Sequence, residues 1–165
     1  MWPGGAQTLV QLPESVGVVL VDERKPDLSY RLLLEWAGGG RNVLCITREP
    51  PERVRARYPL NGAEHFWLVT NGDHRAVSPL RLNSIADRVE SFARRRPNGV
   101  ILIDGVELLM VMNSYEQVRE FLIHIRRLLK SGASCVVPID TRTLTVAELA
   151  ELTSLFPMWQ GETDA

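Results

Sequence analysis

Val100-Ile101-Leu102-Ile103-Asp104-Gly105 is the stretch that decides the fold, with four consecutive apolar residues followed by an acidic residue and a glycine. An unbroken apolar run of this length predicts a strand buried on both faces, as strands are in parallel sheets. The Asp-Gly pair predicts a turn directly after it. The segment therefore predicts a buried strand that ends in a carboxylate.

Similar apolar runs lie on both sides of this segment and alternate with helical patterns. Four more strands are predicted, at residues 16–21, 43–47, 66–70 and 135–139. Helical spacing and cap residues predict five helices, which begin near Pro26, Pro50, Leu82, Ser114 and Thr145. Alternating strands and helices need crossover connections. The expected fold is therefore α/β, a three-layer sandwich with a mainly parallel five-stranded sheet.

The chain of 165 residues is long enough for one domain with its own core. The periodic patterns extend over residues 14–157, which we expect to form a single α/β domain. Residues 1–13 and 158–165 lack such patterns and are predicted to be an N-terminal extension and a C-terminal tail.

The charge balance argues against a dedicated nucleic-acid-binding protein. The 19 basic and 20 acidic side chains give a net charge of −1, so the excess positive charge of such proteins is missing. Arginine clusters at residues 53–57 and 94–96 lack interleaved aromatic residues. We therefore expect no nucleic-acid partner. Among the basic residues only Lys25 and Lys130 are lysines, which limits lysine-dependent chemistry.

The sequence predicts a cytoplasmic protein without membrane contact. The N-terminus lacks the basic and apolar regions of a secretory signal, and no apolar run reaches the roughly 18 residues of a membrane span. Cys45 and Cys135 each lie in a predicted strand and are expected to be buried free thiols in a reducing compartment. The cysteines and histidines show no zinc-ligand spacing.

Polar residues follow the predicted strands, and the carboxyl ends of parallel strands share the sheet edge where α/β proteins bind ligands. The candidate ligand-binding residues there are Asp22, Thr47, Arg48, Asp104 and Asp140. One interpretation is a cation site in which Asp104 and a neighbouring carboxylate hold Mg²⁺. The other is structural: the carboxylates accept hydrogen bonds from backbone amides of the following turns and pair with arginines. We favour the structural interpretation, because polar strand ends are general in this architecture.

The turn after the first strand argues against the usual nucleotide hydrolysis. Phosphate sites normally combine a glycine-rich backbone with a helix N-terminus, but residues 22–27 contain no glycine and place Asp22 and Glu23 where phosphates would approach. No Ser or Thr follows Lys25, as it would in a phosphate loop. Residues 100–105 nevertheless resemble a Walker-B strand, whose aspartate positions magnesium. We expect no catalytic residue and no cofactor, with Mg²⁺ needed only in the alternative function given below.

The apolar segment 106–112 follows the Asp-Gly turn and is interrupted only by Glu107. We expect it to fold under the sheet as a short core segment. In the alternative, it presents Leu108, Met110 and Met112 to a partner, because methionines suit adaptable surfaces.

A specific combination of motifs is spaced over residues 16–156. The motifs are Lys25-Pro26-Asp27 with Tyr30, Leu44-Cys45-Ile46-Thr47-Arg48 with Pro50-Pro51 and Val54-Arg55, Trp67-Leu68, Ile103-Asp104-Gly105-Val106-Glu107-Leu108-Leu109, Asn113, Phe121-Leu122 and Val137-Pro138-Ile139-Asp140. This combination resembles the family called domain of unknown function 835. The resemblance implies a prokaryotic signalling context. It also implies a degenerate P-loop or RecA-like fold, related to the recombinase and circadian-clock ATPases, whose phosphate loop is eroded. It supplies no catalytic residues.

Two functions from different classes remain. The leading hypothesis is a non-catalytic regulatory or protein-interaction module linked to prokaryotic signal transduction. Its partner would be a separate signalling protein or a second copy of the chain. The alternative is a metal-dependent enzyme or nucleotide-binding protein that uses the acidic strand-end cluster, with Arg48 as the anion contact.

Overall fold

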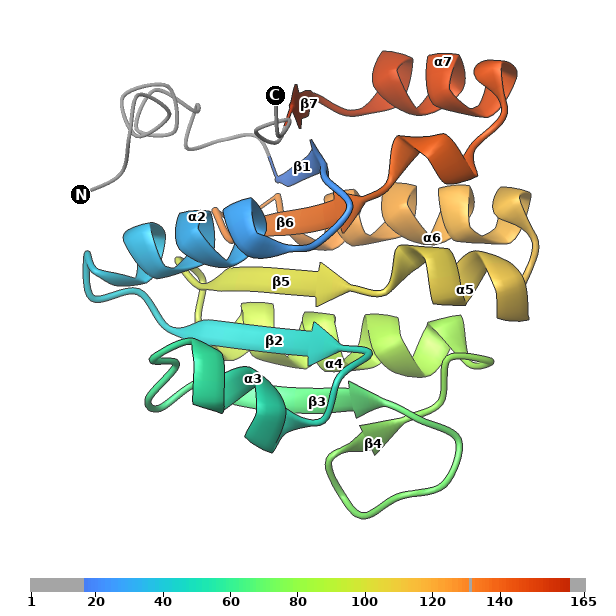
Figure 1. The fold of residues 1–165 in the computed structure, drawn as a ribbon. Coiled ribbons are helices and arrows are strands. Elements are labelled where there is room, and N and C mark those ends of the chain that lie inside the picture. Colours follow the sequence, from blue (N-terminus) through green and yellow to red (C-terminus); the bar gives the residue numbers. More distant parts are fainter. Residues whose placement is uncertain (1–16, 131, 161–165) are drawn as a thin grey trace.

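The computed structural model describes residues 17–130 and 132–160, which form one parallel sheet with helices on both faces (Figure 1). Within these residues the sheet has seven strands in the order β4-β3-β2-β5-β6-β1-β7, and every neighbouring pair is parallel. The strands are β1 (Val18–Asp22), β2 (Val43–Thr47), β3 (Glu64–Leu68), β4 (Ala76–Val77), β5 (Val100–Asp104), β6 (Ser134–Ile139) and β7 (Met158–Gln160).

The helices divide between the two faces of the sheet. They are α2 (Asp27–Ala37), α3 (Pro51–Arg57), α4 (Leu82–Arg95), α5 (Val106–Met112), α6 (Tyr115–Leu128) and α7 (Val146–Leu155), with a short 3₁₀ turn η1 (Thr141–Thr143). Buried residues of α2 and α3 belong to one hydrophobic cluster, and those of the other four helices belong to a second. In Figure 1 α2 and α3 lie in front of the sheet, and α4 and α6 lie behind it.

Alternation along each central strand builds these two clusters. In β1, Val18 and Leu20 point into the α4–α7 cluster, whereas Val19 and Val21 point into the α2–α3 cluster. All residues of β2, β5 and β6 are buried, as expected for parallel strands covered on both faces. The continuous apolar runs of the sequence are therefore explained by burial on both sides of one sheet.

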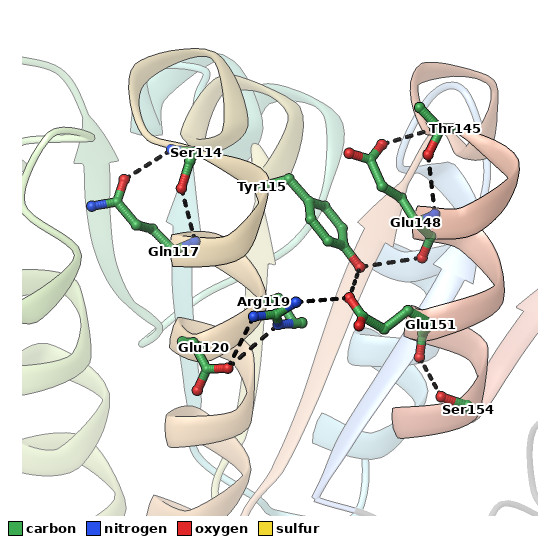
Figure 2. Close-up of polar contacts among 9 residues, drawn as sticks. All are labelled: Ser114, Tyr115, Gln117, Arg119, Glu120, Thr145, Glu148, Glu151 and Ser154. Atoms are coloured by element: carbon green, nitrogen blue, oxygen red, sulfur yellow. Dashed lines mark hydrogen bonds and ion pairs between the residues drawn. The ribbon is translucent and has the colours of Figure 1, made fainter.

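Two capping boxes predicted from the sequence are confirmed. The Ser114 hydroxyl accepts a hydrogen bond from the backbone amide of Gln117, and the Ser114 amide donates to the Gln117 side chain, so the two residues begin α6 (Figure 2). Thr145 and Glu148 do the same for α7. The two helices are joined by Glu151 of α7, which accepts hydrogen bonds from the hydroxyl of Tyr115 and the guanidinium of Arg119 on α6.

The structure corrects the predicted number of strands, seven rather than five. β4 has only two residues, and β7 lies in the segment predicted to be part of a C-terminal tail. β7 is partly exposed and lacks alternation, so its strand conformation depends on pairing with β1 (Leu20 beside Met158), a long-range contact that a local pattern does not contain. The predicted N-terminal extension, residues 1–13, lies outside the described residues.

Both cysteines are free and buried, as predicted. Cys45 lies in β2 and Cys135 in β6, where burial raises the pKa of each thiol, that of Cys45 to about 12. Both thiols are therefore protonated and unreactive at neutral pH.

Gly99, directly before β5, supplies a test of this packing. A Cβ at residue 99 would overlap the ring of Phe92, which is fully buried. We expect Gly99→Ala to lower the free energy of unfolding by about 1–3 kcal/mol, because the ring has to shift within a packed core. The matched control is Gly39→Ala, whose Cβ would meet only the carbonyl oxygen of Trp36 at 3.6 Å. Urea denaturation of both variants measures the difference, and equal stabilities would contradict the packing described.

Candidate functional site

The sheet has two places where neighbouring strands send their connections to opposite faces. β2 leads into α3 on one face, while the adjacent β5 leads into α5 on the other. The same reversal occurs between β6, which leads toward α7, and β1, which leads into α2. Ligands of α/β proteins bind outside the carboxyl ends of the strands at such topological switch points.

The structure distributes the five predicted site residues over these two places. Thr47, Arg48 and Asp104 lie together at the β2/β5 switch point: Thr47 is beside Asp104 in register, and the amide of Arg48 donates to the carbonyl of Asp104 at 3.1 Å. Asp22 and Asp140 lie at the ends of β1 and β6 instead. They therefore belong to a different switch point from Asp104.

The acidic groups at the β6/β1 switch point are used within the protein. Asp22 Oδ1 accepts hydrogen bonds from the amide and hydroxyl of Thr141 at 3.3 and 3.0 Å. Asp140 accepts from the amide and the guanidinium of Arg142, which holds the pKa of Asp140 below its ordinary value. The Asp140 amide in turn donates to Glu107 of α5 at 2.6 Å. These contacts agree with the structural interpretation of the acidic strand ends.

Glu23 caps the N-terminus of α2. Its carboxylate accepts hydrogen bonds from the backbone amides of Leu28 and Ser29, each at 2.8 Å, and from the Ser29 hydroxyl. These donors form the N-terminus of α2, the first helix after β1, where amides and the helix dipole favour an anion. Burial raises the pKa of Glu23, although its hydrogen bonds act in the opposite direction.

Asp104 is the exception among the carboxylates at this edge. It is 3% exposed, and its side chain accepts no hydrogen bond from any of the described residues. Its nearest cation is Arg48, whose Nε lies 3.8 Å from Oδ1. Burial raises the pKa of Asp104 to about 6, an effect that Arg48 partly offsets. The carboxylates of Glu107, Glu49 and Glu23 raise it further.

Tyr30, in the first turn of α2, contributes a second buried polar group. Its hydroxyl has no hydrogen-bond partner in the part of the chain that the structure describes, and the residue is 1% exposed. Burial and then the charge of Asp104 raise the pKa of the Tyr30 hydroxyl, which places it within electrostatic range of that carboxylate. Its ring stacks on Tyr58 at 4.3 Å between centroids, so the side chain is firmly held. Sequence analysis named Tyr30 only as part of the family motif and gave it no site role.

The Thr47 hydroxyl makes its hydrogen bonds within the protein, one of them with His65, to which sequence analysis gave no site role. The Thr47 hydroxyl lies 2.7 Å from the carbonyl oxygen of Glu49 and donates to it. His65 Nε2, also 2.7 Å from that hydroxyl, must therefore be its donor. Burial lowers the pKa of His65 to about 4, so the imidazole is neutral at pH 7. Its Nδ1 is a buried acceptor that has no partner within residues 17–130 and 132–160. One histidine within an apolar strand gave no spacing signal for this contact.

The segment after β5 forms α5 and packs against the sheet. Leu108 and Met110 are partly buried against the core, and Met112 is half-buried. The most exposed residue of α5 is Val111, at 81%. Packing against the core accounts for Leu108 and Met110, whereas Val111 is the apolar side chain directed to the surface.

The described residues contain no group of three or more His, Cys, Asp or Glu side chains placed to hold a metal ion. At the β2/β5 switch point the cation beside Asp104 in the structure is Arg48, whose side chain is 42% exposed. Over the same part of the chain, no helix has the length and apolar character needed to cross a membrane.

Fold and site together define an α/β domain with a parallel sheet, a self-capped first helix and one buried carboxylate at a switch point. Residues 22–156 match the family model described as Protein of unknown function (DUF835), so the chain belongs to this family. The match begins at the end of β1 and ends directly after α7, and it includes both switch points. A search of curated proteins gave no match.

The raised pKa of Asp104 predicts an unusual dependence of stability on pH. Between its ordinary value of 3.8 and about 6, the folded protein keeps a proton that the unfolded chain releases. Stability therefore falls as pH rises through this window, and the loss persists at higher pH. Asp104→Asn removes the effect, so its stability relative to wild type should improve by about 1–3 kcal/mol between pH 4 and pH 7. Urea denaturation at both pH values measures this shift.

Asp140→Asn is the control of opposite sign. Because Arg142 lowers the pKa of Asp140, that carboxylate stabilises the fold at neutral pH and loses this effect as the solution becomes acidic. The variant should therefore lose stability relative to wild type as pH rises. Parallel curves for wild type and Asp104→Asn would show that Asp104 is not buried as described.

Proposed function

We propose that this protein is a non-catalytic regulatory or protein-interaction module, a degenerate RecA-like ATPase domain in a three-layer sandwich that has lost its phosphate loop. The observation that carries the proposal is Glu23, whose carboxylate satisfies the N-terminus of α2 in place of a phosphate. A nucleotide would have to displace this carboxylate, and the adjacent Asp22 would repel its phosphates.

The lysine that would serve a phosphate is also missing. Lys25 lies between β1 and α2, but the turn around it contains no glycine, and a phosphate cradle needs the close backbone approach that glycine allows. A Walker-B-like aspartate remains at Asp104 without a phosphate loop to work with. We further propose that the module acts in prokaryotic signal transduction in the cytoplasm and that its partner is a protein. The resemblance to signalling-associated domains supports this proposal.

A second candidate function rests on Asp104 and Tyr30. Among the described residues the buried Tyr30 hydroxyl has no hydrogen-bond partner, and the buried Asp104 carboxylate has only the ion pair with Arg48. The two groups interact electrostatically near a topological switch point, which favours a small ligand held there. In this alternative, the domain is a nucleotide-binding protein or a magnesium-dependent enzyme in which Arg48 contacts an anionic substrate.

Calorimetric titration with ATP or GTP in the presence of magnesium separates the two functions. Because Glu23 fills the anion position, we expect no binding tighter than about 1 mM. Micromolar affinity, or turnover that Asp104→Ala abolishes, would overturn the regulatory proposal and support the second candidate. Magnesium alone is the reference titration, since binding of the metal without nucleotide also favours the second candidate.

Glu23→Ala tests whether this carboxylate takes the place of an anion. The variant leaves the amides of Leu28 and Ser29 without an acceptor, and loss of such a cap costs about 0.5–2 kcal/mol. Inorganic phosphate should bind the freed amides and raise the melting temperature of the variant more than that of wild type, at constant ionic strength.

Thr145→Ala is the matched control, because it removes a cap from α7 at a site unrelated to β1. If phosphate stabilises the Glu23 and Thr145 variants equally, the α2 terminus has no special affinity for anions. The role assigned to Glu23 would then be wrong.

A further inference from the structure

A groove runs between α4 and α6 on the face of the sheet opposite α2 and α3. Its volume is about 780 Å³, and its floor includes Ala86 and Phe121, which are 4% and 5% exposed. Polar side chains of both helices form its walls, among them Asn83 and Gln117. Figure 2 shows Gln117 on the side of α6 that faces the green helix α4. The groove therefore combines an apolar floor with polar rims, as protein interfaces do.

Exposed apolar side chains border this groove. In the described residues only three large hydrophobic side chains are exposed: Leu80 at 54%, Val111 at 81% and Val146 at 88%. Leu80 lines the groove, and Val111 lies in the last turn of α5, two residues before the groove-lining Asn113. The Asn113 side chain ties these two segments together by donating to the carbonyls of Pro79 and Leu109, each at 2.9 Å. These two exposed side chains lie on the segments that Asn113 joins, and we refer to them as the Leu80–Val111 ridge.

The two walls of the groove carry opposite charges. Arg81, at the start of α4, lies on one wall, and Glu116 and Glu120, in the first turns of α6, lie on the other. Arg81 and Glu116 take part in no ion pair with other described residues. Both helices begin at the carboxyl edge of the sheet, so the positive and negative walls lie at the same height along the groove.

We propose that this face is the contact between two copies of the chain. A two-fold axis along the groove sets the α4 wall of one copy against the α6 wall of the other. Arg81 then faces Glu116 of the partner subunit, and the Leu80–Val111 ridge of each copy packs over the groove of the other. One face supplies both ridge and groove and both charges. A second copy carries matching features at every one of these positions, whereas a different protein would not require this face to carry both charges.

Sedimentation equilibrium of the full chain over about 1–200 µM tests the proposal, because specific dimers fall in this range of affinity. Wild type should dimerise, and Val111→Asp should weaken dimerisation at least about tenfold by placing a charge in an apolar contact. Val146→Asp is the matched control, an equally exposed valine on α7, and should dimerise as wild type does. A monomeric wild type, or equal effects of the two substitutions, would overturn the proposal.

A charge exchange tests the geometry of the contact. Arg81→Glu and Glu116→Arg should each weaken dimerisation, because like charges then face each other across the axis. The double variant should restore it, since the pair is re-formed with opposite signs. Far-ultraviolet circular dichroism verifies that each variant is folded. Failure of the double variant to recover would exclude this orientation of the two copies. Dimerisation is measured by sedimentation without nucleotide, and the regulatory function is tested by nucleotide titration. Either proposal can therefore fail without the other.

Discussion

All seven described strands run in the same direction, and this constraint determines the chemistry of the site. Parallel strands place every carboxyl end at one edge, where several acidic residues meet in partly buried surroundings. Buried carboxylates are costly unless they accept hydrogen bonds. Glu23 accepts hydrogen bonds from the amides of α2, and Asp22 accepts them from Thr141. Glu107 accepts a hydrogen bond from the amide of Asp140. The acidic edge thus joins the loops to one another, a structural use of the residue type that also serves metal and phosphate chemistry.

Local sequence patterns identified the five longer strands, the caps of α6 and α7 and the burial of both cysteines, because each depends on residues close together in the chain. They also placed Asp22, Thr47, Arg48, Asp104 and Asp140 at strand ends. They could not divide these residues between two switch points, since that division depends on strand order, and β6 lies between β1 and β5 only through long-range pairing. The sequence motif included Tyr30 but gave it no site role, because only the folded structure shows that its hydroxyl has no hydrogen-bond partner among the described residues.

The two switch points differ in how completely they are filled. At β6/β1, side chains and turn amides satisfy the carboxylates, and Glu23 closes the end of α2. At β2/β5, Asp104 and Tyr30 keep unused hydrogen-bonding capacity, and the charge of Asp104 costs stability at neutral pH. A fold that needed only stability would gain from an apolar residue at position 104. The carboxylate at β2/β5 is therefore the feature of this edge that packing does not explain.

Nucleotide binding and self-association would place different demands on this fold. A phosphate at α2 must first displace Glu23, and each hydrogen bond to a charged group that is broken costs about 1.5–3 kcal/mol, which is subtracted from the affinity. Association through α4 and α6 requires no such rearrangement, since the ridge, the groove and the charged walls are already exposed. The capped end of α2 and the exposed α4–α6 groove lie on opposite faces of the sheet, so one α/β frame accommodates both features.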